Sequence, residues 1–123
     1  MVKSRGLNHI NLNVSEINRS LKFYRQAFGL KADFWEGKKM VFLRSPGAHD
    51  TITLCQAKKG EPIGPGGVSH FGFRAVEKGQ LDAWVKQVER AGGKLLSRGQ
   101  HAPGVPYAYV ADPDGYVIEL GNS

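Results

Sequence analysis

The sequence predicts an α+β domain made of two tandem βαβββ modules. The first observation is an internal repeat: residues 6–12 read Gly-Leu-Asn-His-Ile-Asn-Leu, and residues 67–73 read Gly-Val-Ser-His-Phe-Gly-Phe. The second is a match between Thr-Ile-Thr-Leu at 51–54 and Val-Ile-Glu-Leu at 117–120. A repeat of this length indicates that each copy is one supersecondary unit.

These matches set the boundaries of the domain and its modules. We expect one domain over 1–123, with modules at about 5–57 and 67–121. Residues 58–66, which are rich in Gly and Pro, form the linker.

The first module begins with alternating residues over 6–14, which predict a strand with one buried face. Ser15 is a candidate N-cap for a helix, and Gly29 is its expected end. The apolar positions of that helix are Ile17, Leu21, Tyr24 and Phe28. Three strands are expected next, at 31–36, 39–45 and 50–56.

The second module repeats this order of elements. A strand is expected at 68–75, followed by a helix at 79–91 that ends before Gly92 and Gly93. The apolar stripe of that helix is Leu81, Trp84, Val85 and Val88. The remaining strands are expected at 94–98, 106–111 and 115–121.

Composition limits the class of protein. A chain of 123 residues can bury a core without disulfides, and it contains a single cysteine, Cys55. No apolar run is long enough to cross a bilayer or act as a signal peptide, so we expect a cytoplasmic protein with no membrane partner. The formal net charge of +6 is scattered. That pattern is typical of a solvated surface or of attraction for an anionic small substrate, and no basic helix indicates nucleic-acid binding.

Three candidate metal ligands lie in the polar phase of their predicted strands: His9, His70 and Glu119. Each points to the side of its sheet that the helices leave uncovered. Two imidazoles and one carboxylate are the ligand set of a facial metal site with open positions. The set favours Fe(II) or Mn(II), and Zn(II), Ni(II) and Co(II) also suit it.

The paired βαβββ plan with these three residues resembles the vicinal oxygen chelate superfamily. That superfamily includes glyoxalase I, extradiol dioxygenases, fosfomycin-resistance enzymes and bleomycin-binding proteins. The resemblance implies a curled mixed sheet around a concave metal site with the helices outside, and a substrate that binds the metal through vicinal oxygens. It also implies a homodimer. The three metal ligands then come either from one chain, or with His9 from one chain and His70 and Glu119 from the other.

The segment that ends at Glu119 is similar to the signature of extradiol ring-cleavage dioxygenases. It runs Gly-Gln-His101, then Tyr109, then Asp112-Pro113-Asp114-Gly115 and Glu119. The resemblance implies that Tyr109 and His101 hydrogen-bond the bound substrate and that Glu119 also has a catalytic role. Two features depart from that subfamily: no further histidine lies near Cys55, and the chain has two modules where most such enzymes have four.

Further residues are expected to contact the substrate: Asn11, Thr53, Arg74 and Tyr107. The sequence therefore favours a metal-dependent enzyme most like a catechol-type dioxygenase. Three alternatives stay open: a glyoxalase-like lyase or isomerase, a fosfomycin-type resistance enzyme, and a non-catalytic drug- or metabolite-binding protein. Thr53 stands where glyoxalase I carries a glutamate, and the phosphonate-binding Lys and Ser positions of the fosfomycin enzymes fall on Gly99 and Pro103.

Overall fold

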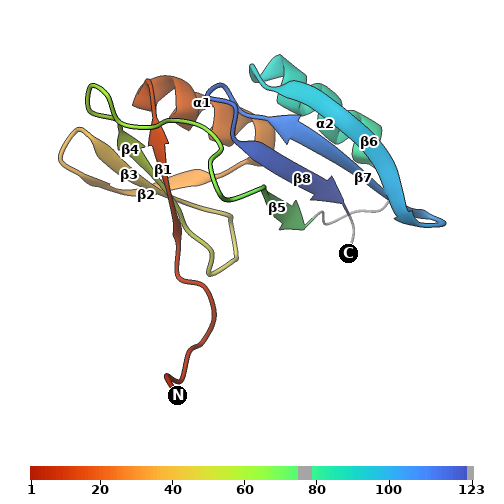
Figure 1. Cartoon of the computed structure of the whole chain (residues 1–123), viewed down its shortest axis with the longest axis horizontal. Helices are drawn as coiled ribbons and strands as arrows, with labels where there is room; N and C mark the ends of the chain where they lie inside the picture. The colour runs from red at the N-terminus through yellow and green to blue at the C-terminus, as the bar shows by residue number, and fades with distance from the viewer. Residues whose placement is uncertain (75–78, 122–123) are drawn as a thin grey trace.

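The computed structural model describes residues 1–74 and 79–121. The first module consists of β1 (Ile10–Val14), α1 (Ile17–Phe28), β2 (Lys31–Glu36), β3 (Met40–Arg44) and β4 (Ile52–Gln56). The second consists of β5 (Phe71–Arg74), α2 (Leu81–Arg90), β6 (Lys94–Ala102), β7 (Val105–Ala111) and β8 (Val117–Gly121). The βαβββ plan is thus confirmed in both copies (Figure 1).

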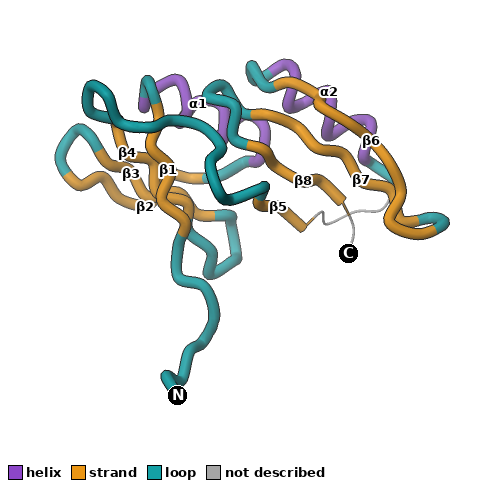
Figure 2. The backbone as a smooth tube through the Cα atoms, viewed as in Figure 1, coloured by secondary structure: helices purple, strands orange, loops and turns teal. Residues whose placement is uncertain are grey.

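Each module forms its own four-stranded mixed sheet. The strand orders are β1-β4-β3-β2 and β5-β8-β7-β6, and the first strand of each module pairs in parallel with the last. The other pairs are antiparallel. Among the described residues the two sheets are not hydrogen-bonded to each other, so they are two sheets side by side (Figure 2) and not one closed sheet.

Both helices lie on the same side of the two sheets and contact each other (Figure 1). The inward faces of β1, β3 and β4 pack against α1, and those of β7 and β8 against α2, because their apolar residues alternate with polar ones. Phe23 and Tyr24 of α1 are fully buried at the centre of this layer. The opposite face of each sheet carries no helix, as the alternation predicts.

Helix α1 starts through a contact that the sequence did not predict, and it ends at the predicted residue. The cap residue is Glu16, and Ser15 is not a side-chain cap, so that prediction was wrong. The Ile17 N–H instead donates to Oε1 of Gln56 at 2.9 Å. Gly29 ends the helix as expected, with a left-handed φ of 66°.

Most strands differ by one or more residues from the predicted ranges, and the differences in β1, β5 and β6 concern candidate site residues. β1 and β5 begin one residue after His9 and His70, so neither histidine lies within a strand. β6 continues to Ala102 because it pairs with β7 across a tight turn, so His101 lies in a strand where a loop was expected. Residue 75 of the expected strand 68–75 lies outside the described residues.

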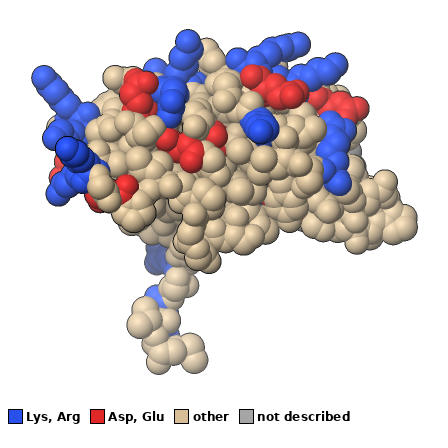
Figure 3. All heavy atoms as spheres, turned by 45° about the horizontal axis from the view of Figure 1, so that its top comes forward, with Lys and Arg blue, Asp and Glu red and all other residues tan. Residues whose placement is uncertain are grey.

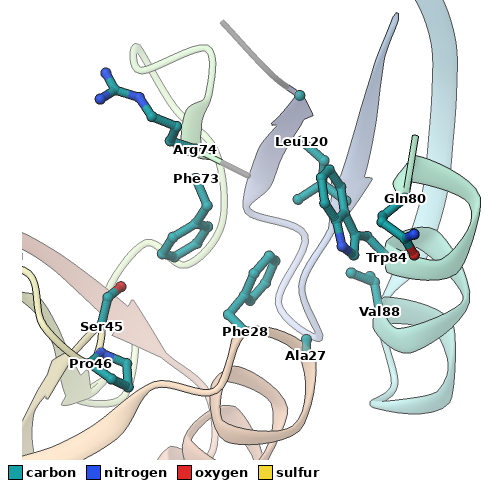
Figure 4. Close-up of a pocket in the computed structure, with 11 residues that line it drawn as sticks. Ala27, Phe28, Ser45, Pro46, Phe73, Arg74, Gln80, Trp84, Val88 and Leu120 are labelled. Atoms are coloured by element: carbon teal, nitrogen blue, oxygen red, sulfur yellow. The ribbon is translucent and has the colours of Figure 1, made fainter. Parts of the chain in front are cut away.

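Aromatic side chains fill the joint between the modules on the helix side. Phe28 at the end of α1 stacks on Phe73 of β5, with ring centroids 4.3 Å apart. Beside this pair lies an apolar hollow of about 520 Å³, with Trp84 and Leu120 on its opposite wall (Figure 4). In Figure 4 the Arg74 side chain points away from Phe73 and Phe28, toward the other side of β5.

Two carboxylates in the turn between β7 and β8 connect the second module to α1 of the first. Asp114 accepts hydrogen bonds from the backbone N–H and the hydroxyl of Ser15. It also forms an ion pair with Arg19, at 3.1 Å. Asp112 accepts from the Tyr24 hydroxyl at 2.7 Å. Burial raises the pKa of Asp112, although its hydrogen bonds oppose that shift. The turn was expected from its Asp-Pro-Asp-Gly sequence, whereas its contact with α1 was not.

Basic side chains are spread over the helix side with acidic ones among them (Figure 3). Some are engaged in ion pairs, such as Arg98 with Asp82 and Arg19 with Asp114. Of the helices in the described residues, neither has the length and apolar character required to cross a bilayer.

We expect Asp114→Ala to lower the free energy of unfolding by about 2–4 kcal/mol. The Asp114 side chain is only 4% exposed and accepts several hydrogen bonds, so its removal breaks the contacts to Ser15 and Arg19 and leaves the buried Ser20 hydroxyl without this partner. Urea unfolding followed by circular dichroism measures the change.

The matched control is Asp33→Ala, which also removes an aspartate from an ion pair. Asp33 pairs with Arg44 at 3.0 Å, but both side chains are about half exposed, so its loss should cost about 0–1 kcal/mol. Equal costs for the two variants would show that the Asp114 contacts do not hold the modules together.

Candidate functional site

Glu119 lies at the centre of the helix-free face of the second sheet. It is in register with Gly72 of β5 on one side and Tyr109 of β7 on the other, and Tyr109 is in register with Ser97 of β6. Residues in register point to the same face of a sheet. The buried Ile118 and Leu120 point the opposite way, so the alternation of β8 fixes the direction of the Glu119 side chain.

Two histidines converge on this carboxylate. His101 Nε2 lies 2.8 Å from Glu119 Oε1, and His70 Nε2 lies 4.0 Å from Glu119 Oε2. His70 comes from the segment before β5 and His101 from the far edge of the sheet, at the end of β6. Both rings are exposed, so the group is open to small molecules.

Aromatic rings form one wall around Glu119. Tyr109 meets His70 edge-on at 4.9 Å between ring centroids, and Tyr107 stacks on His101 at 4.3 Å. Partial burial and the neighbouring Glu119 carboxylate raise the pKa of Tyr109, so its hydroxyl stays a hydrogen-bond donor at neutral pH. The wall combines a carboxylate, two imidazoles and a phenol on one side of a sheet.

An open cavity of about 500 Å³ adjoins this group. Glu119, His101 and Arg74 line it, together with Gly72 and Gly121. Asp50, from the loop before β4, forms another part of its wall. Asp50 was missed by the sequence reasoning, because nothing in the local pattern shows that a loop of the first module reaches the face of the second.

Two of the predicted site residues of the first module line small cavities at the edge of this group: Asn11 lines one with His70, and His9 lines another with Gly72. His9 is exposed, with Nδ1 2.6 Å from Oδ1 of Asn8. Asn11 accepts a hydrogen bond from the Cys55 thiol, and the buried Thr53 hydroxyl has no partner among the described residues. Within 1–74 and 79–121 no three His, Cys, Asp or Glu side chains are grouped so as to hold a metal ion.

One chain therefore brings together only part of the predicted site. His70, His101, Tyr107, Tyr109, Glu119 and Arg74 share the face of the second sheet. His70 and Glu119 could serve as two ligands of one ion, since the 4.0 Å between their atoms is only about 1 Å more than neighbouring ligands need. His9, Asn11 and Thr53 belong to the other sheet.

Comparison with known proteins gives a consistent family. The sequence model of the Glyoxalase/Bleomycin resistance protein/Dioxygenase superfamily matches residues 6–120. A probable trivalent organoarsenical cleaving enzyme of Bacillus subtilis is 28% identical over 87% of this chain and 73% of its own length. The metallothiol transferase FosB of Shouchella clausii is 26% identical over 94% of this chain and 78% of its own.

A solved structure shares the fold at low identity. The fosfomycin resistance protein FosX of Listeria monocytogenes, solved with Mn(II) and dihydroxypropylphosphonic acid, superposes with a TM-score of 0.79. The two sequences are 20% identical over 98% of this chain and 93% of that one.

We expect Gly99→Ala to displace the Tyr107 ring from its stack on His101. An added Cβ at Gly99 would lie 2.4 Å from the Tyr107 hydroxyl, and a tyrosine ring can move aside by rotation. The His101 ring proton shifts in an NMR spectrum report the loss of the stack.

The matched control is Gly66→Ala, where an added Cβ would meet nothing within 4 Å. It should leave the His101 signals unchanged. Unchanged His101 signals in Gly99→Ala as well would mean that Tyr107 does not rest over Gly99 in solution.

Proposed function

Because the chain belongs to the Glyoxalase/Bleomycin resistance protein/Dioxygenase superfamily, we propose that it is a divalent-metal-dependent transferase or lyase for a small substrate with vicinal oxygens. The observation that carries this proposal is the convergence of His70, His101 and Tyr109 on Glu119 at an open cavity. The relatives support the reaction class, since one is named a metallothiol transferase and another a probable trivalent organoarsenical cleaving enzyme.

The metal ligands we propose are His70 and Glu119 together with His9. Their chemistry, two imidazoles and a carboxylate, suits an ion with open positions for a substrate. Such an ion acts as a Lewis acid that polarises a substrate oxygen. Mn(II) is the first candidate, because FosX, which has the same fold, was solved with it.

We propose that His9 comes from a second copy of the chain. It lies on the other module, outside any three-ligand group of the described residues. The accessible surface also exceeds that of a compact monomer: it is 8341 Å², against about 6,500 Å² expected for 13.5 kDa. The exposed N-terminal residues account for part of the excess, and the two uncovered sheet faces for another part. A twofold dimer would cover these faces and complete two identical sites.

The remaining side chains have roles that follow from their positions. The Tyr109 hydroxyl, which keeps its proton, donates a hydrogen bond to a substrate oxygen that gains negative charge. His101 stands beside Glu119, and its imidazole can form a hydrogen bond, as donor or acceptor, to the same substrate oxygen. Asn11 and Thr53 would face the substrate from the partner module.

Ring cleavage of a catechol, the function that the sequence favoured, has less support than these alternatives. The named relatives are a transferase and a cleaving enzyme, and neither name specifies an extradiol dioxygenase. β4 presents Thr53 and Cys55 beside Asn11 where that subfamily needs a further acid/base histidine. We therefore place transferase or lyase chemistry first.

We expect His9→Ala and Glu119→Gln each to abolish Mn(II) binding in isolation, and an equal mixture of the two to recover about one quarter of the wild-type sites. In a mixed dimer one site combines the intact His9 of one chain with the intact Glu119 of the other. Isothermal titration of unfolded and refolded mixtures measures the stoichiometry.

The control is His49→Ala, which removes an exposed histidine that is not one of the proposed ligands. It should keep full stoichiometry. Binding by His9→Ala alone would exclude His9 as a ligand, and no recovery in the mixture would place the ligands within one chain. Absence of any metal binding by the wild type would favour the non-catalytic binding protein.

We expect Tyr109→Phe to keep Mn(II) and to lower turnover about tenfold or more, because it removes one donor to the reacting oxygen. One assay follows the loss of fosfomycin with and without an added thiol. A second follows the loss of a thiol adduct of methylglyoxal. Tyr116→Phe is the control: its hydroxyl donates to the Asn13 carbonyl at 2.7 Å, so its loss should affect stability and not turnover. Equal turnover in wild type and Tyr109→Phe would make Tyr109 structural.

A further inference from the structure

The sheet beside Glu119 has a bare patch on its helix-free face. Two rows of residues cross the sheet there: Gly72, Glu119, Tyr109 and Ser97 form one, and Arg74, Gly121, Tyr107 and Gly99 form the next. Gly72 and Gly121 carry no side chain, so backbone alone forms the floor between Glu119 and Arg74. This floor lies inside the cavity of about 500 Å³.

The glycines at these two positions are not explained by backbone conformation. Neither has a positive φ, and strand interiors normally favour residues with side chains. At Gly72 an added Cβ would sit 3.0 Å from the Glu119 carbonyl oxygen, so the close approach of β8 accounts for that glycine. At Gly121 it would sit 3.3 Å from the Pro106 carbonyl oxygen, which is tighter than most Cβ contacts, and 3.6 Å from Tyr107 Cβ. A side chain at Gly121 would also fill part of the cavity above this backbone floor.

Arg74 stands at the end of this floor. It lies one strand away from Glu119 and two residues along, so their Cα atoms are about 8 Å apart. Its side chain leaves β5 on the side opposite Phe73, as Figure 4 shows, and it lines the same cavity as Glu119. A guanidinium is suited to a planar or tetrahedral anion, which it can bind through two N–H groups.

The carboxylate of Asp50 on the cavity wall restricts where an anion can lie. Its Oδ1 accepts a hydrogen bond from the Ser45 N–H at 2.8 Å, which holds it in place. An anionic group is repelled from that part of the wall and attracted to Arg74.

We propose that Arg74 and the floor of Gly72 and Gly121 form a subsite for a compact anionic group, a carboxylate or a phosphonate, carried by the substrate next to its vicinal oxygens. This inference rests on the proposed function, in which the metal ion at Glu119 would bind the vicinal oxygens of the substrate. The substrate is then a small oxygen-bearing acid, and a neutral catechol leaves the subsite empty. The space over Gly121 limits the size of the anionic group, and the guanidinium of Arg74 selects for its negative charge.

The test compares three hydroxamates on Mn(II)-loaded protein by isothermal titration. Acetohydroxamate is a neutral chelator with vicinal oxygens, malonomonohydroxamate adds a carboxylate, and phosphonoacetohydroxamate adds a phosphonate. We expect one of the anionic compounds to bind about tenfold more tightly than the neutral one. The better of the two identifies the group that the subsite accepts.

Two variants separate charge from space. Arg74→Met should lose the preference for the anionic compound and keep the affinity for acetohydroxamate, whereas Arg90→Met, on α2, removes the same charge and should keep the preference. Gly121→Val should weaken the anionic compounds most, and Gly66→Val, in open space, should change nothing.

The outcomes distinguish this inference from the proposed function. If none of the three hydroxamates binds, the proposed metal site fails as well. If all three bind equally to the wild type, or if Arg74→Met keeps the preference, the metal site stands and the anionic subsite is wrong.

Discussion

The contact between the β7–β8 turn and helix α1 determines how the two modules sit together. Asp114 accepts from the start of the helix, and Asp112 accepts from Tyr24 in its middle. Both carboxylates are largely removed from water, and such groups need all of their hydrogen bonds to be satisfied. Because β8 begins three residues after Asp114, this contact also fixes where Glu119 lies relative to the first module.

The two modules are repeats of one plan, but the helix-free faces of their sheets carry different side chains. In the first sheet Asn11, Thr53, Phe42 and Phe34 are in register, at the places held by Gly72, Glu119, Tyr109 and Ser97 in the second. The carboxylate and the phenol of one row are thus a neutral hydroxyl and a phenyl ring in the other. The second module presents a carboxylate and a phenol, and the first presents two neutral polar side chains and two phenyl rings, with Phe34 exposed.

The sequence allowed prediction of those features that depend on local periodicity. Alternation along β8 places Glu119 opposite Ile118 and Leu120, and the repeat shows that His9 and His70 are equivalent. It did not show that His101 belongs to a strand, because its Gly and Pro neighbours are typical of loops, and pairing with β7 overrides that local preference. The bonds of Asp114 to Ser15 span 99 residues, so no local pattern contains them.

The position of His9 shows why part of the site could not be predicted from one chain. Equivalence by repeat places His9 and His70 at the same point of two sheets, but it also separates them, since the sheets lie side by side with their helices on one side (Figure 1). A face without a helix is left open in each module, and the buried Thr53 hydroxyl lies on such a face without a partner among the described residues. A buried polar group without a hydrogen bond costs free energy. A ligand or another chain that contacts this face can supply the missing partner. One twofold contact that places the first module of one chain over the second module of its partner would cover the open sheet faces. The same contact would bring His9 to His70 and Glu119 and so complete the ligand set.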